Sequence, residues 1–242
     1  MFTGFPEGTE QFFLDIRFHN NADYYHSNIE RYRRDVQTPF YALIEDLVPS
    51  LLDIDSQMET RPYKLLSRLR RDTRFTKDKT PYRDHLWTYF HRAAEPKENS
   101  IGFWFEYGPG RVLWGMGSWG ENRLLMDRMR REFAARPDYY MGLIHSCGLP
   151  QKHLELRADL WKRMKVPGNI PLELEPWYRI RNFGIMQTFP DVREASSREL
   201  FMHVRSDFQA MAPLYQMLRG MQDQLDKESM NFKESLLTET AE

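Results

Sequence analysis

Residues 60–92 hold a concentrated group of side chains that could bind an anion. This segment has ten basic and three acidic side chains, a net charge of +7, whereas the other 209 residues sum to −8. Guanidinium groups present planar forks of donors that bind carboxylate or phosphate through two hydrogen bonds at once. The composition of this segment therefore predicts a place where anions gather, either the protein's own aspartates or an external ligand.

The predicted ligand-binding residues all lie between positions 68 and 83. In this hypothesis the arginines hold the anion and Lys79 adds positive charge. Asp72 or Asp78 orients the arginines or acts as a base, and Tyr82 donates a hydrogen bond to the same ligand. The complete set is Arg68, Arg71, Asp72, Arg74, Asp78, Lys79 and Tyr82.

Three interpretations of this segment remain open on sequence alone. An Arg-Asp-Lys network can simply fix a long loop to a sheet, since structural ion pairs often resemble functional sites. The segment can also bind a small phosphate or carboxylate ligand, with or without catalysis. The third interpretation is a surface for nucleic acid or a protein partner, with exposed aromatics such as Trp87 or Tyr89. The charge of −8 elsewhere disfavours a long polyanion, so a small anionic ligand is the leading functional hypothesis.

Other chemistries have weaker support in the sequence. The seven histidines do not show a standard metal-ligand spacing, and there is no His-Glu-x-x-His, so no metal site is predicted. Cys147 has no local feature of a nucleophile and is expected to be a buried thiol. There is no glycine-rich dinucleotide or phosphate-loop motif. No motif specifies a cofactor, a reaction or an oligomeric state.

The charged segment also resembles the signature of a conserved family of uncharacterised proteins, found mainly in bacteria and also in fungi. The pattern Arg-Asp-x-Arg-Phe-x-x-Asp-Lys-x-Pro-Tyr falls on residues 71–82. Phe2-x-Gly4-Phe5, Asn20-Asn21, Tyr32, Pro39 and the Gly115–Trp119 segment are similar to the family as well. The resemblance covers most of residues 1–135. It implies no established activity, cofactor or catalytic residue.

The elements that must position these residues follow from hydrophobic periodicity. Steps of three and four predict a helix over 29–47, kinked or split at Pro39, and further helices over 124–133, from Pro137, and over 196–215. Alternation predicts strands over 64–70, 86–91, 101–107 and 111–117, the last two forming a hairpin around Gly108-Pro109-Gly110. Residues 148–194 match neither period.

Helices at both ends around antiparallel strands predict an α+β fold with a central sheet. We expect a single domain over residues 1–220 and a polar, acidic tail over 221–242. One cysteine excludes an internal disulfide, and neither a signal peptide nor an apolar stretch of membrane-spanning length is evident. These features favour a soluble, cytoplasmic protein without a membrane partner.

Overall fold

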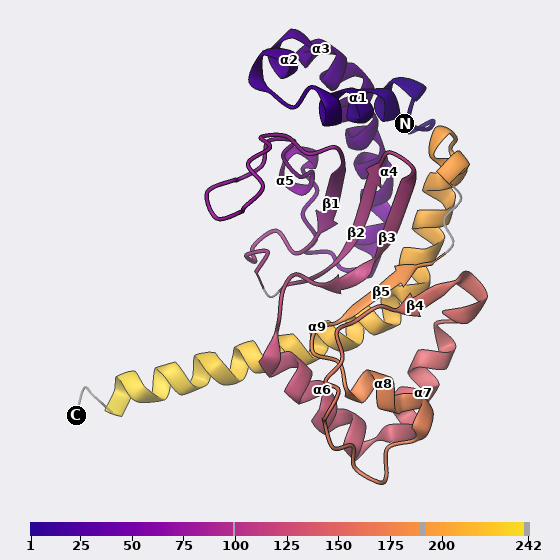
Figure 1. The fold of residues 1–242 in the computed structure, drawn as a ribbon. Helices are drawn as coiled ribbons and strands as arrows, with labels where there is room; N and C mark the ends of the chain where they lie inside the picture. The colour runs from indigo at the N-terminus through magenta and orange to yellow at the C-terminus, as the bar shows by residue number, and fades with distance from the viewer. Residues whose placement is uncertain (99, 189–191, 240–242) are drawn as a thin grey trace.

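The chain forms a five-stranded antiparallel sheet in the order β1-β2-β3-β5-β4, with helices on one face, which confirms the predicted α+β class (Figure 1). The computed structural model describes residues 1–98, 100–188 and 192–239. The strands are β1 (Leu86–Phe90), β2 (Ile101–Gly108), β3 (Arg111–Ser118), β4 (Leu154–Leu156) and β5 (Gly184–Gln187). The helices are α1 (Glu7–Phe18), α2 (Ala22–Ser27), α3 (Ile29–Tyr32), α4 (Thr38–Ile54), α5 (Pro62–Leu65), α6 (Arg123–Ala135), α7 (Pro137–Ser146), α8 (Glu175–Tyr178) and α9 (Glu199–Glu239).

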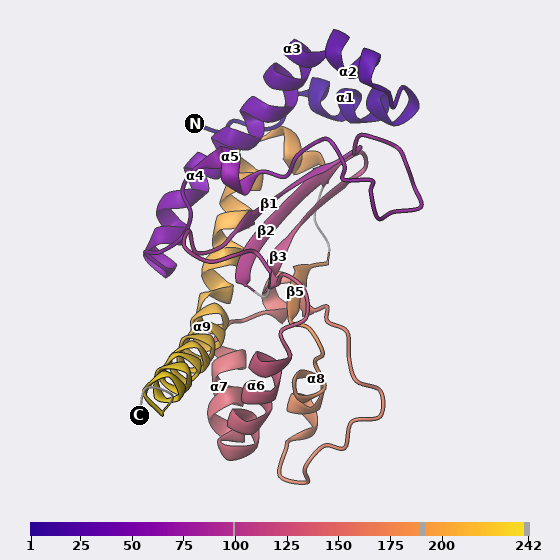
Figure 2. The same ribbon diagram turned by 90° about the vertical axis from the view of Figure 1, so that its left-hand side faces the viewer.

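The two faces of the sheet differ because side chains alternate along each strand. Phe103 and Phe105 of β2 are buried and face α4 and α9, which lie behind the sheet in Figure 1. The Phe103 ring lies 4.9 Å from Phe208 and 5.1 Å from Tyr215 of α9, measured between ring centroids. Figure 2 shows α4 and α9 on the same side of β1–β3. The opposite face, which carries Trp104 of β2, has no long helix over it.

The predicted helix over 29–47 is divided where the sequence places a proline. A π-helical turn over Arg33–Gln37 separates α3 from α4, and Pro39 lies in the first turn of α4. A proline is tolerated there because the first amide groups of a helix have no partner within it.

The predicted strand over 64–70 is wrong. Residues Pro62–Leu65 form the short helix α5, and beyond it the chain makes only isolated bridges, Leu66 with Thr88 and Arg70 with Tyr82. Proline favours the first helical turn, which explains this helix. The predicted partition of side chains is nevertheless observed, since Leu65 and Leu69 are buried.

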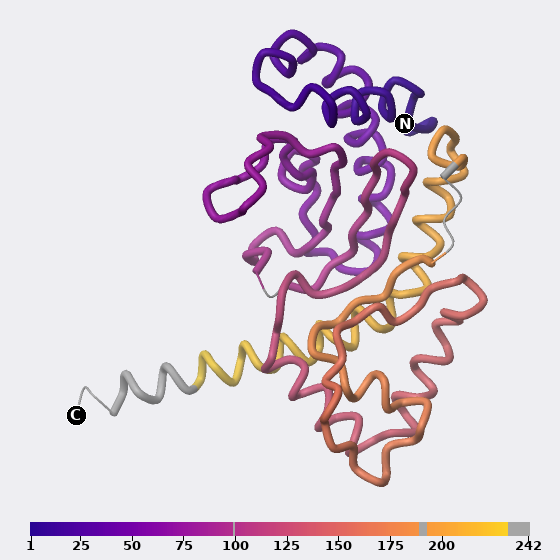
Figure 3. Tube along the Cα trace, in the orientation of Figure 1, coloured from indigo at the N-terminus to yellow at the C-terminus, as the bar shows by residue number. Residues whose placement is uncertain are grey.

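The segment over 148–194 supplies two strands that periodicity did not predict. β5 pairs with β3 and β4 pairs with β5, and both strands have only three or four residues. The first half of α9 packs on the sheet, and Figure 3 shows the yellow part of the trace that follows it running past α6 and away from the sheet. Pro213 lies inside α9 and removes one backbone donor, and the helix changes direction along its length (Figure 1).

Candidate functional site

The loop over residues 72–80 holds most of the predicted site residues, and its charges pair with one another. Arg71 donates to the carboxylate of Asp78 and, at 2.6 Å, to the hydroxyl of Thr80. Arg74 and Asp72 form a second pair at 2.7 Å. Lys79 donates from its Nζ to a backbone carbonyl of the same loop at 2.8 Å. The loop is therefore held by its own ion pairs, as the structural interpretation predicts.

These pairs make the two aspartates weak bases. Hydrogen bonds from Arg74 lower the pKa of Asp72 to about 2. The hydrogen bond from Arg71, followed by those from Thr80, lowers the pKa of Asp78 below its usual range. A carboxylate this acidic accepts a proton poorly at neutral pH, so neither aspartate is suited to act as a general base.

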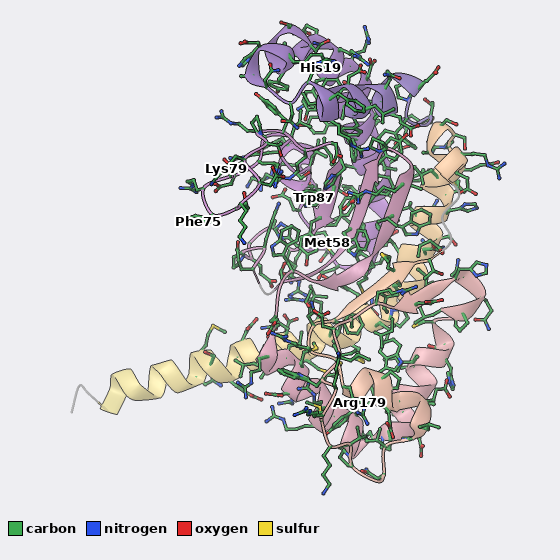
Figure 4. The ribbon with its side chains drawn as sticks, in the orientation of Figure 1. His19, Met58, Phe75, Lys79, Trp87 and Arg179 are labelled. Atoms are coloured by element: carbon green, nitrogen blue, oxygen red, sulfur yellow. The ribbon has the colours of Figure 1, made fainter. Side chains whose placement is uncertain are left out.

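The base of the loop is anchored in the core. Tyr82 is only 5% exposed and stacks on Tyr25 with ring centroids 4.8 Å apart. The Asn20 side chain accepts a hydrogen bond from the Tyr82 backbone amide and donates one to its carbonyl, both at 2.9 Å. The tip of the loop is exposed to solvent, and the Phe75 side chain there is 90% exposed. Figure 4 shows Phe75 and Lys79 at the outer end of this loop.

Beside the loop lies a groove of about 870 Å³ that we call the basic groove. Its lining includes six cationic side chains and two carboxylates. The cations are Lys64, Arg68, Arg70, Arg71, Arg83 and Lys97, and the carboxylates are Glu59 and Asp72. Both carboxylates already hold an arginine, Glu59 with Arg61 at 2.6 Å and Asp72 with Arg74. The basic groove therefore has an excess of positive charge.

Arg68 and Arg70 are exposed, and among the described residues neither side chain has a carboxylate within ion-pair distance. Arg83 donates to the backbone carbonyls of both residues, at 2.7 and 3.1 Å. Burial, and then the charge of Arg71, lowers the pKa of Arg83. Burial lowers the pKa of Lys97, and the nearby charge of Arg68 adds to this effect. Burial is the main cause of both shifts, and the smaller contributions of Arg71 and Arg68 reflect like charges that lie close together in the groove.

A second hollow, of about 410 Å³, adjoins the basic groove on the helix-free face of the sheet, and we call it the aromatic pocket. Its walls include Trp87, Tyr89, Trp104 and Trp119. Trp87 and Trp119 also line the basic groove. Figure 4 labels Trp87, which comes from β1 near the base of the loop. The two hollows thus share a wall of indole rings.

The structure brings three of the predicted residues, Arg68, Arg71 and Asp72, into the lining of the basic groove. Arg74, Asp78 and Lys79 belong to the loop, and Tyr82 belongs to its anchor. Sequence reasoning missed the contribution of Arg70, Arg83 and Lys97 to the groove. Arg70 alternates with Arg68 in the sequence, which was a usable signal. Lys97 lies beyond the next strand, and nothing local connects it to the groove.

The other candidate chemistries have no support among the described residues. No three His, Cys, Asp or Glu side chains gather there in a way that could hold a metal ion. Cys147 is buried, and burial raises the pKa of its thiol. His145 is bonded to Glu173 at 2.6 Å on the surface. The basic groove and the aromatic pocket are therefore the best supported site, beside a third hollow of about 470 Å³ that is also lined by Trp87 and holds Arg71, Asp72, Asp78 and Tyr82.

A model of a family of conserved hypothetical proteins, DUF2461, matches residues 8–217. The chain belongs to this family. The match extends well past residue 135, so the family includes β4, β5 and much of α9, which the sequence signature did not reach. Searches of curated proteins and of solved structures returned no match. Within the described ranges, no helix is both long enough and apolar enough to cross a bilayer.

Proposed function

We propose that this protein binds a small anionic ligand, a phosphate or carboxylate compound, in the basic groove. The observation that carries the proposal is the state of Arg68 and Arg70. Both are exposed in the groove, and no carboxylate of the described chain pairs with either side chain. Arginine forks match phosphate and carboxylate oxygens, and a charge-assisted pair of this kind is stronger than a neutral hydrogen bond.

The neighbouring cations support the same proposal. Arg71 lines the groove, and its guanidinium also donates hydrogen bonds to Asp78 and Thr80 within the loop. Arg83 and Lys97 add charge while their own pKa values are lowered. A bound anion would reduce the repulsion between these neighbouring positive charges. The loop residues Asp72, Arg74, Asp78 and Lys79 then act as the frame that fixes one wall of the groove.

The proposal is tested by calorimetric titration with inorganic pyrophosphate and, separately, with citrate. Low ionic strength is used because salt screens exposed charges. The double variant Arg68→Ala/Arg70→Ala is compared with Arg123→Ala, whose side chain is 90% exposed on α6. We expect the double variant to bind at least about tenfold more weakly than wild type, and Arg123→Ala to match wild type.

Two results would contradict the proposal. One is the absence of binding of either anion to the wild-type protein. The other is an equal loss of affinity in Arg123→Ala and in the double variant, which would show general charge attraction without a site. A preference for pyrophosphate or for citrate distinguishes phosphate from carboxylate as the recognised group.

A further inference from the structure

We infer that the aromatic pocket is the second half of the same site and receives a planar ring. The ligand is then a nucleoside phosphate or a compound built like one, with a nitrogenous ring joined to a phosphate. This inference rests on the proposed anion binding in the basic groove and adds the class of ligand. Three features support it: the aromatic walls of the pocket, the backbone at its floor and the tryptophans that it shares with the groove.

The indole rings in the walls of the pocket are suited to stacking on a ring, whereas Tyr89 is only 2% exposed and packs against Trp119. Trp87, Tyr89 and Trp104 project from β1 and β2 on the helix-free face, where Tyr89 pairs with Trp104 across the strands. The Trp119 ring lies 5.1 Å from Tyr89 and 6.5 Å from Trp87, measured between centroids. Trp119 is 37% exposed although it is a large aromatic side chain. Aromatic faces bind any nucleobase by stacking because every base has a π-face.

The floor of the pocket is backbone. Gly117 of β3 lies opposite Gly102 of β2 on one side and Gly184 of β5 on the other, so three glycines form a row across the sheet. A Cβ atom at Gly117 would lie 2.7 Å from the carbonyl oxygen of Phe183, and one at Gly184 would lie 2.6 Å from that of Arg157. The close approach of these carbonyls requires glycine at Gly117 and Gly184, and both residues line the pocket without a side chain, whereas the Tyr89 ring lies against Gly102.

The connection between the two hollows places a ring and a phosphate within one ligand. Trp87 and Trp119 line both spaces. The guanidinium of Arg83 lies 4.7 Å from the centroid of the Trp87 ring, a cation–π contact. The same guanidinium binds the backbone of Arg68 and Arg70. One residue therefore links the aromatic wall to the arginines proposed to hold the anion.

Polar groups at the edge of the pocket provide contacts for the heteroatoms of such a ring. Glu106 and His85 line it, each already oriented by a partner, Arg111 at 2.7 Å and Asp84 at 2.8 Å. A mainly aromatic cavity with a few oriented polar groups is the usual form of a small-molecule site. Most of the indole and phenol rings gather in the pocket, and besides the shared Trp87 and Trp119 the groove is lined by Tyr63 and His91. This favours one ring over a single-stranded nucleic acid.

The test compares ligands that differ only in the ring. The four common ribonucleoside 5′-monophosphates are each titrated against ribose 5-phosphate. We expect at least one of them to bind about tenfold or more tightly than ribose 5-phosphate, in line with the contribution of one stacked base. Trp119→Ala should abolish this gain and weaken the binding of ribose 5-phosphate much less than Arg68→Ala/Arg70→Ala does. Trp119→Phe should restore part of the gain.

Two control variants separate the possible causes. Trp161→Ala removes an indole that is 44% exposed and does not line the pocket, so it should retain the gain. Arg68→Ala/Arg70→Ala should weaken nucleotides and ribose 5-phosphate to a similar extent. Circular dichroism establishes that each variant is folded.

Three outcomes would overturn the inference, and they differ in what they say of the groove. If all nucleotides bind no more tightly than ribose 5-phosphate, and this binding depends on Arg68 and Arg70, the ring site is wrong and the anion site stands. If none of these phosphates binds, and pyrophosphate and citrate fail to bind as well, the proposed function falls together with the ring site. If a ten-nucleotide single strand binds more than about tenfold more tightly than every mononucleotide, the ligand is a polymer.

Discussion

Two clusters of arginines in this protein use the same side chain in opposite ways. At the junction of α4, β1 and α9, the guanidinium of Arg92 holds Asp55 at 2.7 Å and Asp223 at 2.9 Å. Arg219 holds Glu95 at 2.6 Å and Asp223 at 2.7 Å, and it is only 3% exposed. In the basic groove, Arg68 and Arg70 are exposed, and no described carboxylate pairs with them.

The two clusters differ in whether their arginines are paired with carboxylates. This separates arginines that stabilise the fold from arginines that are available for binding. A buried charge must be paired, because leaving it alone costs several kcal/mol, so the Arg92–Arg219 cluster is required for stability. An exposed cation has no such requirement and stays solvated. The presence of several arginines in a sequence therefore says little until their partners are known. Four measurements test whether the two clusters differ in this way.

The largest expected effect is the loss of Asp55. Burial alone would raise the pKa of this carboxyl, but hydrogen bonds from Arg92, Gln57 and Tyr215 hold it below its usual value. Asp55→Ala removes the nearest partner of the partly buried Arg92 and the acceptor of the Tyr215 hydroxyl, so we expect a loss of about 3 kcal/mol in the free energy of unfolding in urea. Asp53→Ala, on the exposed side of the same helix, should have little effect. Equal effects of both substitutions would remove the distinction between the clusters.

The next largest effect is the loss of unfolding free energy at acidic pH. Hydrogen bonds from the side chain and backbone of Arg61 lower the pKa of Glu59 from 4.5 to about 2. A carboxyl with a lowered pKa stabilises the folded state above its unfolded pKa, and this stabilisation is lost as the pH falls from about 4.5 to about 2. At pH 7, Glu59→Gln should lose on the order of 2 kcal/mol in the free energy of unfolding.

The wild-type and Glu59→Gln curves should converge as the pH approaches about 2, because the wild-type carboxyl is then protonated. The measurement is the urea unfolding free energy from pH 7 down to pH 2. Glu45→Gln, an exposed substitution on α4, serves as the control and should follow the wild-type curve. A constant gap between wild type and Glu59→Gln across this range would show that titration of Glu59 has no part in acid unfolding.

A smaller effect is expected from the loop pair. Asp78→Ala frees Arg71 and removes a negative charge beside the groove, so pyrophosphate should bind about threefold more tightly. Calorimetry on Asp78→Ala and on Asp138→Ala, which removes an exposed carboxylate on α7, separates the local effect from the change in net charge. A weaker affinity in Asp78→Ala would mean that the loop conformation contributes more to binding than the freed arginine does.

The smallest effect is on the stability of the ligand-free groove. Arg68→Ala/Arg70→Ala should change the free energy of unfolding by less than about 0.5 kcal/mol, because neither side chain has a partner to lose. The measurement is the same urea titration without added anion. A destabilisation as large as that of Asp55→Ala would show that these arginines stabilise the fold, and it would contradict their proposed role in binding.

Much of the framework could be predicted because its signals are local. The recurrence of Ile101, Phe103, Phe105 and Tyr107 at alternate positions, followed by Gly108-Pro109-Gly110, was enough to predict the hairpin, and the structure confirms it. β4 and β5 were not predicted, because strands of three or four residues show no measurable period. Their place in the sheet depends on pairing with β3, which is information from distant sequence.

The candidate site was predictable to a different degree. Charge density pointed to residues 68–83, but it could not separate arginines that meet aspartates from those that do not. Arg71 and Arg74 pair within the loop, whereas Arg68 does not, and only the path of the chain decides this. The aromatic pocket was hidden for the same reason. Trp119 and Gly184 are 65 residues apart and meet because β3 and β5 are neighbours.

The long helix α9 has a consequence for how fast a ligand can enter the site. Its first half packs on α4, β2 and β3, and further along it contacts α6, with Asn122 donating to Gln222 at 2.7 Å. One continuous helix thus braces β1–β3 together with the part of the chain that carries β5, the opposite wall of the aromatic pocket. A braced pocket cannot open by a swing of its two walls. Association should therefore proceed in one step, with an observed rate that rises linearly with ligand concentration and shows no plateau.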